Sequence, residues 1–182
     1  MKKTSFILLF SLLSAFTAYS QIYLCKGGSI SFFSETPIEN IDAHSTNLNS
    51  ILNTSTGEVV FMVPITSFKF AKALMQEHFN EKYLESDKFP SATFKGKINE
   101  TIDYTKDGTY PITATGKLTV HGVEKERTEK GTLTIKNGVI SIETSFKVLV
   151  KDHNVEIPTL VMQNIAEAVL VKINATYAAY KK

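Results

Sequence analysis

The 182-residue chain has no tryptophan and a single cysteine, and it lacks the short motifs of common catalytic and cofactor sites. No Walker loop, G-x-S-x-G elbow or G-x-G-x-x-G fingerprint occurs. Its four histidines are far apart and show none of the spacings typical of metal sites. We therefore expect no metal, no cofactor and no enzymatic activity. The histidines are His44, His78, His121 and His153.

An excess of charge of either sign is also missing once the first twenty residues are set aside. These residues combine Lys2 and Lys3 with an apolar stretch over 6–16 and small residues before Gln21, which predicts a signal peptide cleaved near Ser20. The remaining eighteen basic residues balance eighteen acidic ones, which argues against a nucleic-acid partner. No transmembrane span is expected after processing, and the predicted location is periplasmic or secreted.

The single cysteine, Cys25, lies just beyond the expected cleavage site. A lipid-modified N-terminus is one interpretation of this position. A free, half-buried thiol on the first strand is the other, and it is favoured because Tyr23 and Leu24 occupy positions where lipoprotein signals have small residues.

Alternation of apolar and polar residues dominates what is present. Residues 139–151 alternate over their whole length, which predicts a strand with one buried face. Asn137-Gly138 predicts a tight hairpin to residues 128–136. Further strands are expected near 21–33, 41–52, 59–65, 92–98, 112–120 and 169–175.

One helix interrupts this series, because apolar residues between 71 and 83 recur at helical spacing. We interpret it as a plug under one end of the fold, or as a lid at its mouth. A second short helix over 159–168 is expected after Pro158. The stripe comprises Ala71, Leu74, Met75, His78, Phe79 and Tyr83.

Eight strands in succession predict an all-β fold, an antiparallel barrel with one or two short helices, formed by a single domain over 21–182. An eight-stranded barrel is just wide enough to be filled by side chains or to hold one small ligand. Twelve Phe and seven Tyr could fill the interior, whereas small inward residues could leave it hollow. Both interpretations stay open at this stage. The small residues are Ala92, Gly96, Ala114 and Ala175.

Two segments resemble signatures of the YceI-like family: YLESDKFPSATF at 83–94 and GKLTVHGVEK at 116–125. The resemblance implies an exported bacterial protein with an elongated, lipocalin-like barrel, whose relatives hold a polyisoprenoid or other long-chain amphiphile in an apolar tunnel. Glu124 stands where the family usually has Thr, and the family's early His-Ser pair has no clear counterpart, since His44-Ser45 falls later and in a different setting. The identity of the ligand therefore does not carry over.

The sequence thus predicts a carrier that holds a long-chain lipid or isoprenoid inside the barrel. The alternative is a packed barrel that binds an envelope protein, or a second copy as a homodimer, through exposed Met62, Leu149 and Leu170. An enzyme acting on lipid is a third possibility, with no nucleophile and base to support it. The predicted ligand-binding residues are Phe61, Val63, Phe79, Tyr83, Phe94, Leu118, Val120, Ile142, Phe146, Val148, Val171 and Ile173.

Overall fold

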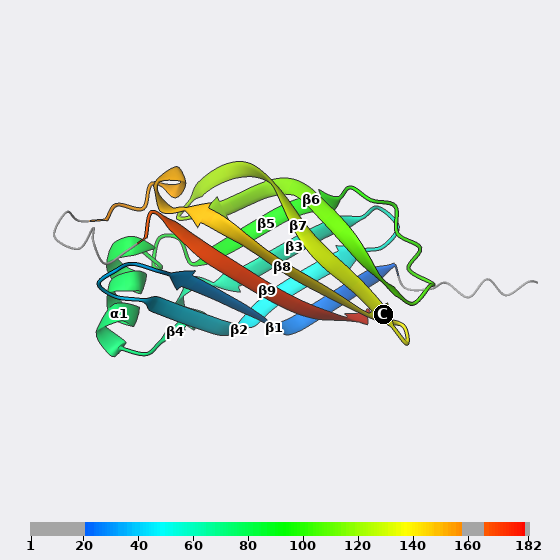
Figure 1. Cartoon of the computed structure of the whole chain (residues 1–182), viewed down its shortest axis with the longest axis horizontal. Coiled ribbons are helices and arrows are strands. Elements are labelled where there is room, and N and C mark those ends of the chain that lie inside the picture. The colour runs from blue at the N-terminus through cyan, green and yellow to red at the C-terminus, as the bar shows by residue number, and fades with distance from the viewer. Residues whose placement is uncertain (1–20, 158–165, 181–182) are drawn as a thin grey trace, which may run out of the picture.

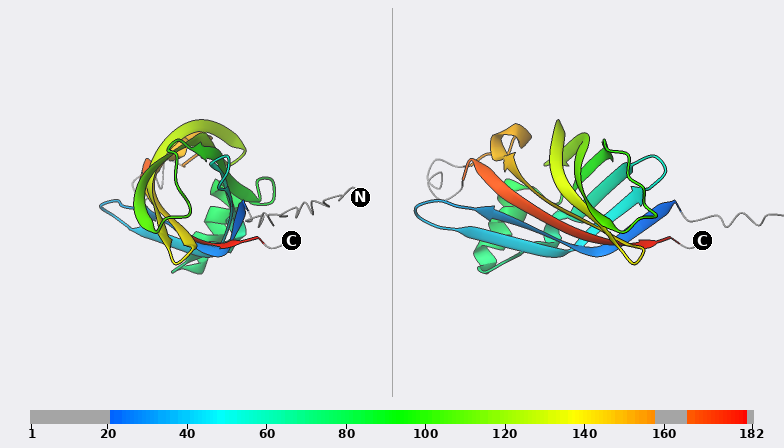
Figure 2. Two further views of the ribbon diagram at one scale, coloured as in Figure 1. Left: turned by 90° about the vertical axis from the view of Figure 1, so that its right-hand side faces the viewer. Right: turned by 45° about the vertical axis from the view of Figure 1, so that its right-hand side comes forward.

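The computed structural model describes residues 21–157 and 166–180, which form an elongated antiparallel β-barrel with a short helix at one end (Figure 1). Viewed along its length, the strands form a closed ring (Figure 2). The two-residue strand β4 (Lys69–Phe70) pairs with β2 outside this ring. The eight long strands are β1 (Ile22–Ser34), β2 (Ile41–Asn53), β3 (Glu58–Pro64), β5 (Ser91–Ile98), β6 (Gly108–Val120), β7 (Val123–Lys136), β8 (Val139–Leu149) and β9 (Ala168–Ala179).

The strands follow the chain around the barrel from β2 to β9, and β1 closes the ring between β9 and β2. All the pairings are antiparallel, so the predicted fold class and the eight predicted strands are confirmed. The strand expected over 139–151 ends earlier, at Leu149, because a 3₁₀ turn begins at Val150 and extends to His153.

Two tight turns connect β6, β7 and β8. Asn137 and Gly138 join β7 to β8 with φ angles of 52° and 75°, as expected for the predicted hairpin turn. His121 and Gly122 join β6 to β7 in the same way, with φ angles of 51° and 71°. His121 is therefore the turn residue that its position before a glycine predicts.

The helical segment consists of α1 (Ala73–His78) followed by a π-helical turn over Phe79–Tyr83. Met75, Phe79 and Tyr83 face the barrel interior as the stripe predicts. Leu74 does not, since 60% of its surface is exposed. Ala71 precedes the helix, because Lys72 still has extended backbone angles. The second predicted helix lies mostly in 158–165, outside the described residues.

The interior differs between the two ends of the barrel. In the half away from α1, inward side chains are almost fully buried and pack around Tyr177. In the half next to α1, many inward apolar side chains stay only partly buried. A solid core therefore fills the half of the barrel away from α1. Only the half next to α1 can be hollow. The packed half contains Leu52, Val59, Ile98, Leu133, Ile135, Ile140 and Ala175.

Candidate ligand-binding cavity

A cavity of about 300 Å³ occupies the half of the barrel next to α1. Ligand pockets in proteins commonly measure about 300–1,000 Å³ and are mainly apolar, so this one lies at the small end of that range. Its wall is built from the inward faces of β1, β3, β5, β6, β8 and β9, together with α1 and the π-helical turn. Phe32, Phe79 and Phe146 face the cavity and remain partly accessible, because no protein atoms cover them there.

Eleven of the twelve predicted ligand-binding residues line this cavity. Period-2 alternation fixed the inward face of each strand correctly, which is why they lie together. The twelfth, Ile142, lies deeper toward the packed half and lines a smaller neighbouring cavity. The eleven residues are Phe61, Val63, Phe79, Tyr83, Phe94, Leu118, Val120, Phe146, Val148, Val171 and Ile173.

Four phenylalanine rings form an aromatic wall beside α1. Phe79 from the π-helical turn stacks on Phe32 of β1, with 5.4 Å between ring centroids. Phe68 and Phe70 contact the same two rings at centroid distances of 5.0–5.8 Å. Such ring pairs stabilise one another beyond the area they bury. The sequence prediction included only Phe79, although alternation along β1 could have identified Phe32.

The floor of the cavity is formed where Phe61 of β3 lies directly opposite Phe94 of β5. The Phe94 ring folds over Gly96, where a Cβ atom would lie only 2.7 Å from the ring. Gly96 therefore makes room for a neighbouring side chain and not for a ligand. The expectation that small residues leave empty space is wrong here and at Ala175, which is fully buried in the packed half. It holds at Ala92, which lines the cavity.

The cavity contains one fully buried polar ring, that of His153. Its Nδ1 lies 3.0 Å from the carbonyl oxygen of Val123, so Nδ1–H donates this bond. Nε2 then carries the lone pair, and it has no hydrogen-bond partner. Burial lowers the pKa of His153 below its usual value, so the ring is neutral near pH 7. A neutral ring is compatible with an apolar surrounding.

The two signature segments meet beside the cavity, at the β6–β7 turn. Nε2 of His121 lies 3.0 Å from Oε2 of Glu85, and the His121 ring packs edge-on against Phe89 at 4.7 Å. A hydrogen bond from Lys88, and a second from His121, lower the pKa of Glu85 below its usual value. Glu85 is therefore a partly exposed loop acid that is held by two specific contacts. Sequence reasoning missed the contact with His121 because it joins residues 36 positions apart.

Nothing in the described part of the chain forms a metal site, because no three His, Cys, Asp or Glu side chains cluster there. The described helices are also too short or too polar to cross a membrane.

Cys25 is a free thiol buried on β1, and burial raises its pKa, so it is poorly reactive. The arrangement can enclose an apolar chain.

A closed antiparallel barrel with an apolar internal cavity defines the structural class of this protein. Residues 28–177 match the YceI-like domain, and the chain belongs to that family. The comparison with curated proteins returns no match.

Solved structures with the same fold support this assignment. A polyisoprenoid binding domain from Saccharophagus degradans, implicated in plant cell wall breakdown, has a TM-score of 0.74 at 14% identity, covering 88% of this chain and 99% of that one. BcnA from Burkholderia cenocepacia has a TM-score of 0.69 at 15% identity, covering 82% and 95%. The YCEI protein of Campylobacter jejuni has a TM-score of 0.62 at 16% identity, covering 81% and 90%. At these identities the likeness concerns the fold.

Proposed function

We propose that this protein is a non-catalytic carrier that encloses the tail of one long-chain amphiphile, an isoprenoid or fatty-acyl lipid, in its barrel. The observation that carries the proposal is the cavity of about 300 Å³, lined by apolar side chains that the protein itself leaves uncovered. The polyisoprenoid-binding relative of the same fold supports this ligand class.

The affinity of such a carrier comes from burial of the tail. Each methylene group removed from water contributes about 0.8 kcal/mol, so ten groups contribute about 8 kcal/mol. Part of this is offset by the lost freedom of the ligand, which leaves binding in a useful range. Because the cavity is small, affinity should rise with chain length and then level off when the tail fills it.

The predicted signal peptide supports a location outside the cytoplasm, in the periplasm or the medium. Its residues lie outside the described ones, so export is part of the proposal. An exported carrier protects an apolar chain from water between two membranes or on its way to an acceptor. Its partner is then the lipid itself, and neither nucleic acid nor a cofactor is required.

Titration of delipidated protein with a fluorescent fatty acid, followed by competition with unlabelled alcohols of increasing chain length, tests the proposal. We expect saturable binding of one probe per chain and an affinity that rises by up to about fourfold per methylene, the equivalent of 0.8 kcal/mol. Binding that is not saturable, or that is independent of chain length, would contradict an internal site.

The alternative function is a solid barrel that binds a protein through its outer surface. Only one half of the interior is solid, so the structure agrees with this alternative in that half alone. Its exposed apolar residues include Met62 on β3 and Ile51 on β2, whose outward side chains are diagonal neighbours. Leu149 is also exposed, whereas Leu170 is partly buried. A homodimer through this small surface stays a prediction, which sedimentation of the purified protein can test.

A further inference from the structure

The wall of the barrel is interrupted between β7 and β8. The two strands pair only from Gly131 to Lys136 on β7 and from Val139 to Thr144 on β8. Beyond this point β7 continues to pair with β6, and β8 with β9, but not with each other. Figure 1 shows β7 arching away from β8 along this stretch. We call the stretch between residues 124–130 and 145–149 the seam.

Side chains, and not backbone pairs, hold the seam together. At its closed end, the hydroxyl of Thr144 donates to the carbonyl of Lys130 at 2.6 Å. At its far end, Nδ1 of His153 donates to Val123. Between them, the guanidinium of Arg127 donates from Nη2 to the carbonyl of Lys147 at 2.7 Å. The seam is therefore a bounded opening, bridged at one point.

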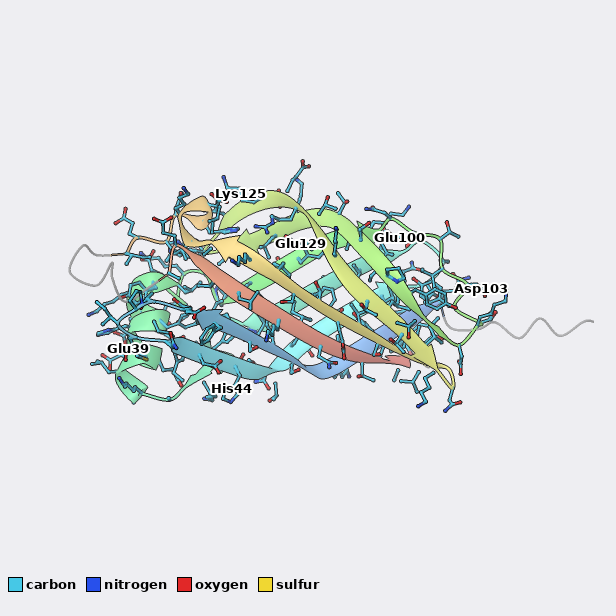
Figure 3. The ribbon with its side chains drawn as sticks, in the orientation of Figure 1. Glu39, His44, Glu100, Asp103, Lys125 and Glu129 are labelled. Atoms are coloured by element: carbon cyan, nitrogen blue, oxygen red, sulfur yellow. The ribbon has the colours of Figure 1, made fainter. Side chains whose placement is uncertain are left out.

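The inner face of β7 becomes charged along the seam. Alternation places Glu129 and Arg127 on the same face as the buried Leu133 and Ile135. Only 22% of the Arg127 side chain and 19% of the Glu129 side chain are exposed, and Figure 3 shows Glu129 beside the opening. Charges on the apolar side of a wall are costly unless they are paired. Arg127 and Glu129 meet this condition by pairing with each other.

Both bonds of the ion pair converge on a single oxygen. Nε of Arg127 lies 2.7 Å, and Nη2 2.5 Å, from Oε1 of Glu129. A guanidinium has five N–H donors, and three are satisfied by Glu129 and Lys147. Among residues 21–157 and 166–180, nothing bonds to the two N–H groups of Nη1 or to the second oxygen of Glu129. The pair thus presents a donor beside an acceptor.

The seam adjoins the cavity that would hold a tail. Arg127 and Glu129 line a second cavity of about 50 Å³. Five residues line both this space and the main cavity, so the two spaces are direct neighbours with these side chains between them. They are Phe61, Phe94, Leu118, Phe146 and Ile173.

We propose that Arg127 and Glu129 bind the head of the amphiphile whose tail occupies the main cavity, and that this head is an uncharged hydroxyl. The inference rests on the proposed function and adds the chemistry of the head. A hydroxyl can accept a hydrogen bond from Nη1 of Arg127 and donate one to Oε2 of Glu129. A carboxylate or phosphate offers no donor and is repelled by Glu129, so the site selects against anions.

The test compares three probes of equal chain length, namely a long-chain alcohol, its methyl ether and the corresponding fatty acid, on delipidated protein. The wild type should bind the alcohol about tenfold more tightly than the ether or the fatty acid, since hydrogen bonds to charged groups are worth at least this much. Only the alcohol can donate to Glu129, so Glu129→Met should remove the preference for alcohol over ether. Arg127→Met keeps the aliphatic stem and should weaken the alcohol and the ether alike, because both can accept from Nη1. Glu129→Gln leaves Arg127 unpaired and should raise the affinity for the fatty acid about tenfold.

Lys117→Met is the matched control, because Lys117 of β6 forms an ion pair with Glu124 of β7 on the outer face of the barrel. It should leave all three affinities unchanged, and thermal unfolding shows whether each variant is folded. If the probes bind to the wild type but every variant shows the same preference among the three head groups, the proposed head site is contradicted. The proposal of a lipid carrier is then unaffected. If no probe binds the wild type, the carrier proposal itself is contradicted.

Discussion

Oε2 of Glu85 lies 3.0 Å from Nε2 of His121, which joins the loop after the helical segment to the turn between β6 and β7. Nδ1 of the same ring lies 3.2 Å from the carbonyl oxygen of His153. His121 thus connects three segments at the helix end of the barrel, two of which also contribute residues to the cavity wall. We infer that it stabilises the shape of the cavity without contacting the ligand.

Glu85→Gln should weaken this connection at neutral pH and have little effect in acid. The pKa of Glu85 is lowered in the folded protein, so its contribution is present above the unfolded pKa of about 4.3 and is lost as the pH falls through the folded value. The melting temperatures of wild type and variant should differ at about pH 7, and the difference should shrink as the pH falls below the unfolded value of about 4.3. A constant difference across this range would show that the carboxylate charge is not involved.

The same substitution at two alanines should give opposite results in the two halves of the barrel. In Ala92→Leu the larger side chain fills part of the cavity, so the stability of the protein should be nearly unchanged. Lipid uptake should fall more than tenfold, because the leucine displaces about three methylenes of the tail. Ala175→Leu overpacks the solid half and should lower the free energy of unfolding by about 1–3 kcal/mol or more. Chemical denaturation and probe binding measure both effects. Equal destabilisation would indicate a uniformly packed barrel.

Tyr177→Phe should lower stability without changing lipid uptake. The hydroxyl of Tyr177 lies 2.7 Å from Oγ of Ser50, whose own proton is donated to Val60, so Tyr177 is the donor. Losing this buried hydrogen bond should cost about 0.5–1.5 kcal/mol. Denaturation measures the loss, and unchanged probe affinity is expected because Tyr177 lies in the packed half. A matching loss of affinity would mean that the ligand extends through the whole barrel.

His153 should make the protein less stable in mild acid. Burial, together with the nearby charges of Arg127 and Lys125, lowers its pKa, while Val123 and Asp152 act in the opposite direction. The unfolded chain therefore binds a proton more readily, and stability falls as the pH drops below the unfolded value of about 6.5. His153→Asn retains a donor for Val123 and removes the titration. Its unfolding free energy should vary less between about pH 7 and pH 5 than that of the wild type; identical profiles would contradict this.

Local rules predicted the strands well because each one has a single buried face. Asn137-Gly138 fixed one hairpin, and alternation on β8 placed Phe146 and Val148 inward. The inward faces of the cavity residues follow from the same period of two, and Ile142 lies on the expected inward face but deeper in the barrel. Alternation reports which face a residue is on, but not how deep in the barrel it lies.

Features that depend on long-range packing were not predictable in this way. The gap between β7 and β8 involves Arg127 and Glu129, whose inward charges break the pattern that identifies a buried face. The contact of Glu85 with His121 joins two segments that alternation treats separately. Whether Ala92 or Ala175 adjoins empty space depends on which neighbouring rings fill it, and this requires coordinates.

The central claim is that one half of the barrel encloses an apolar chain. Native mass spectrometry of protein purified without detergent, followed by organic extraction, tests it most directly. We predict a bound species at one per chain that extracts as a long-chain amphiphile and is depleted in Ala92→Leu but not in Tyr177→Phe. Protein that carries no lipid and takes none up when it is offered would contradict the account.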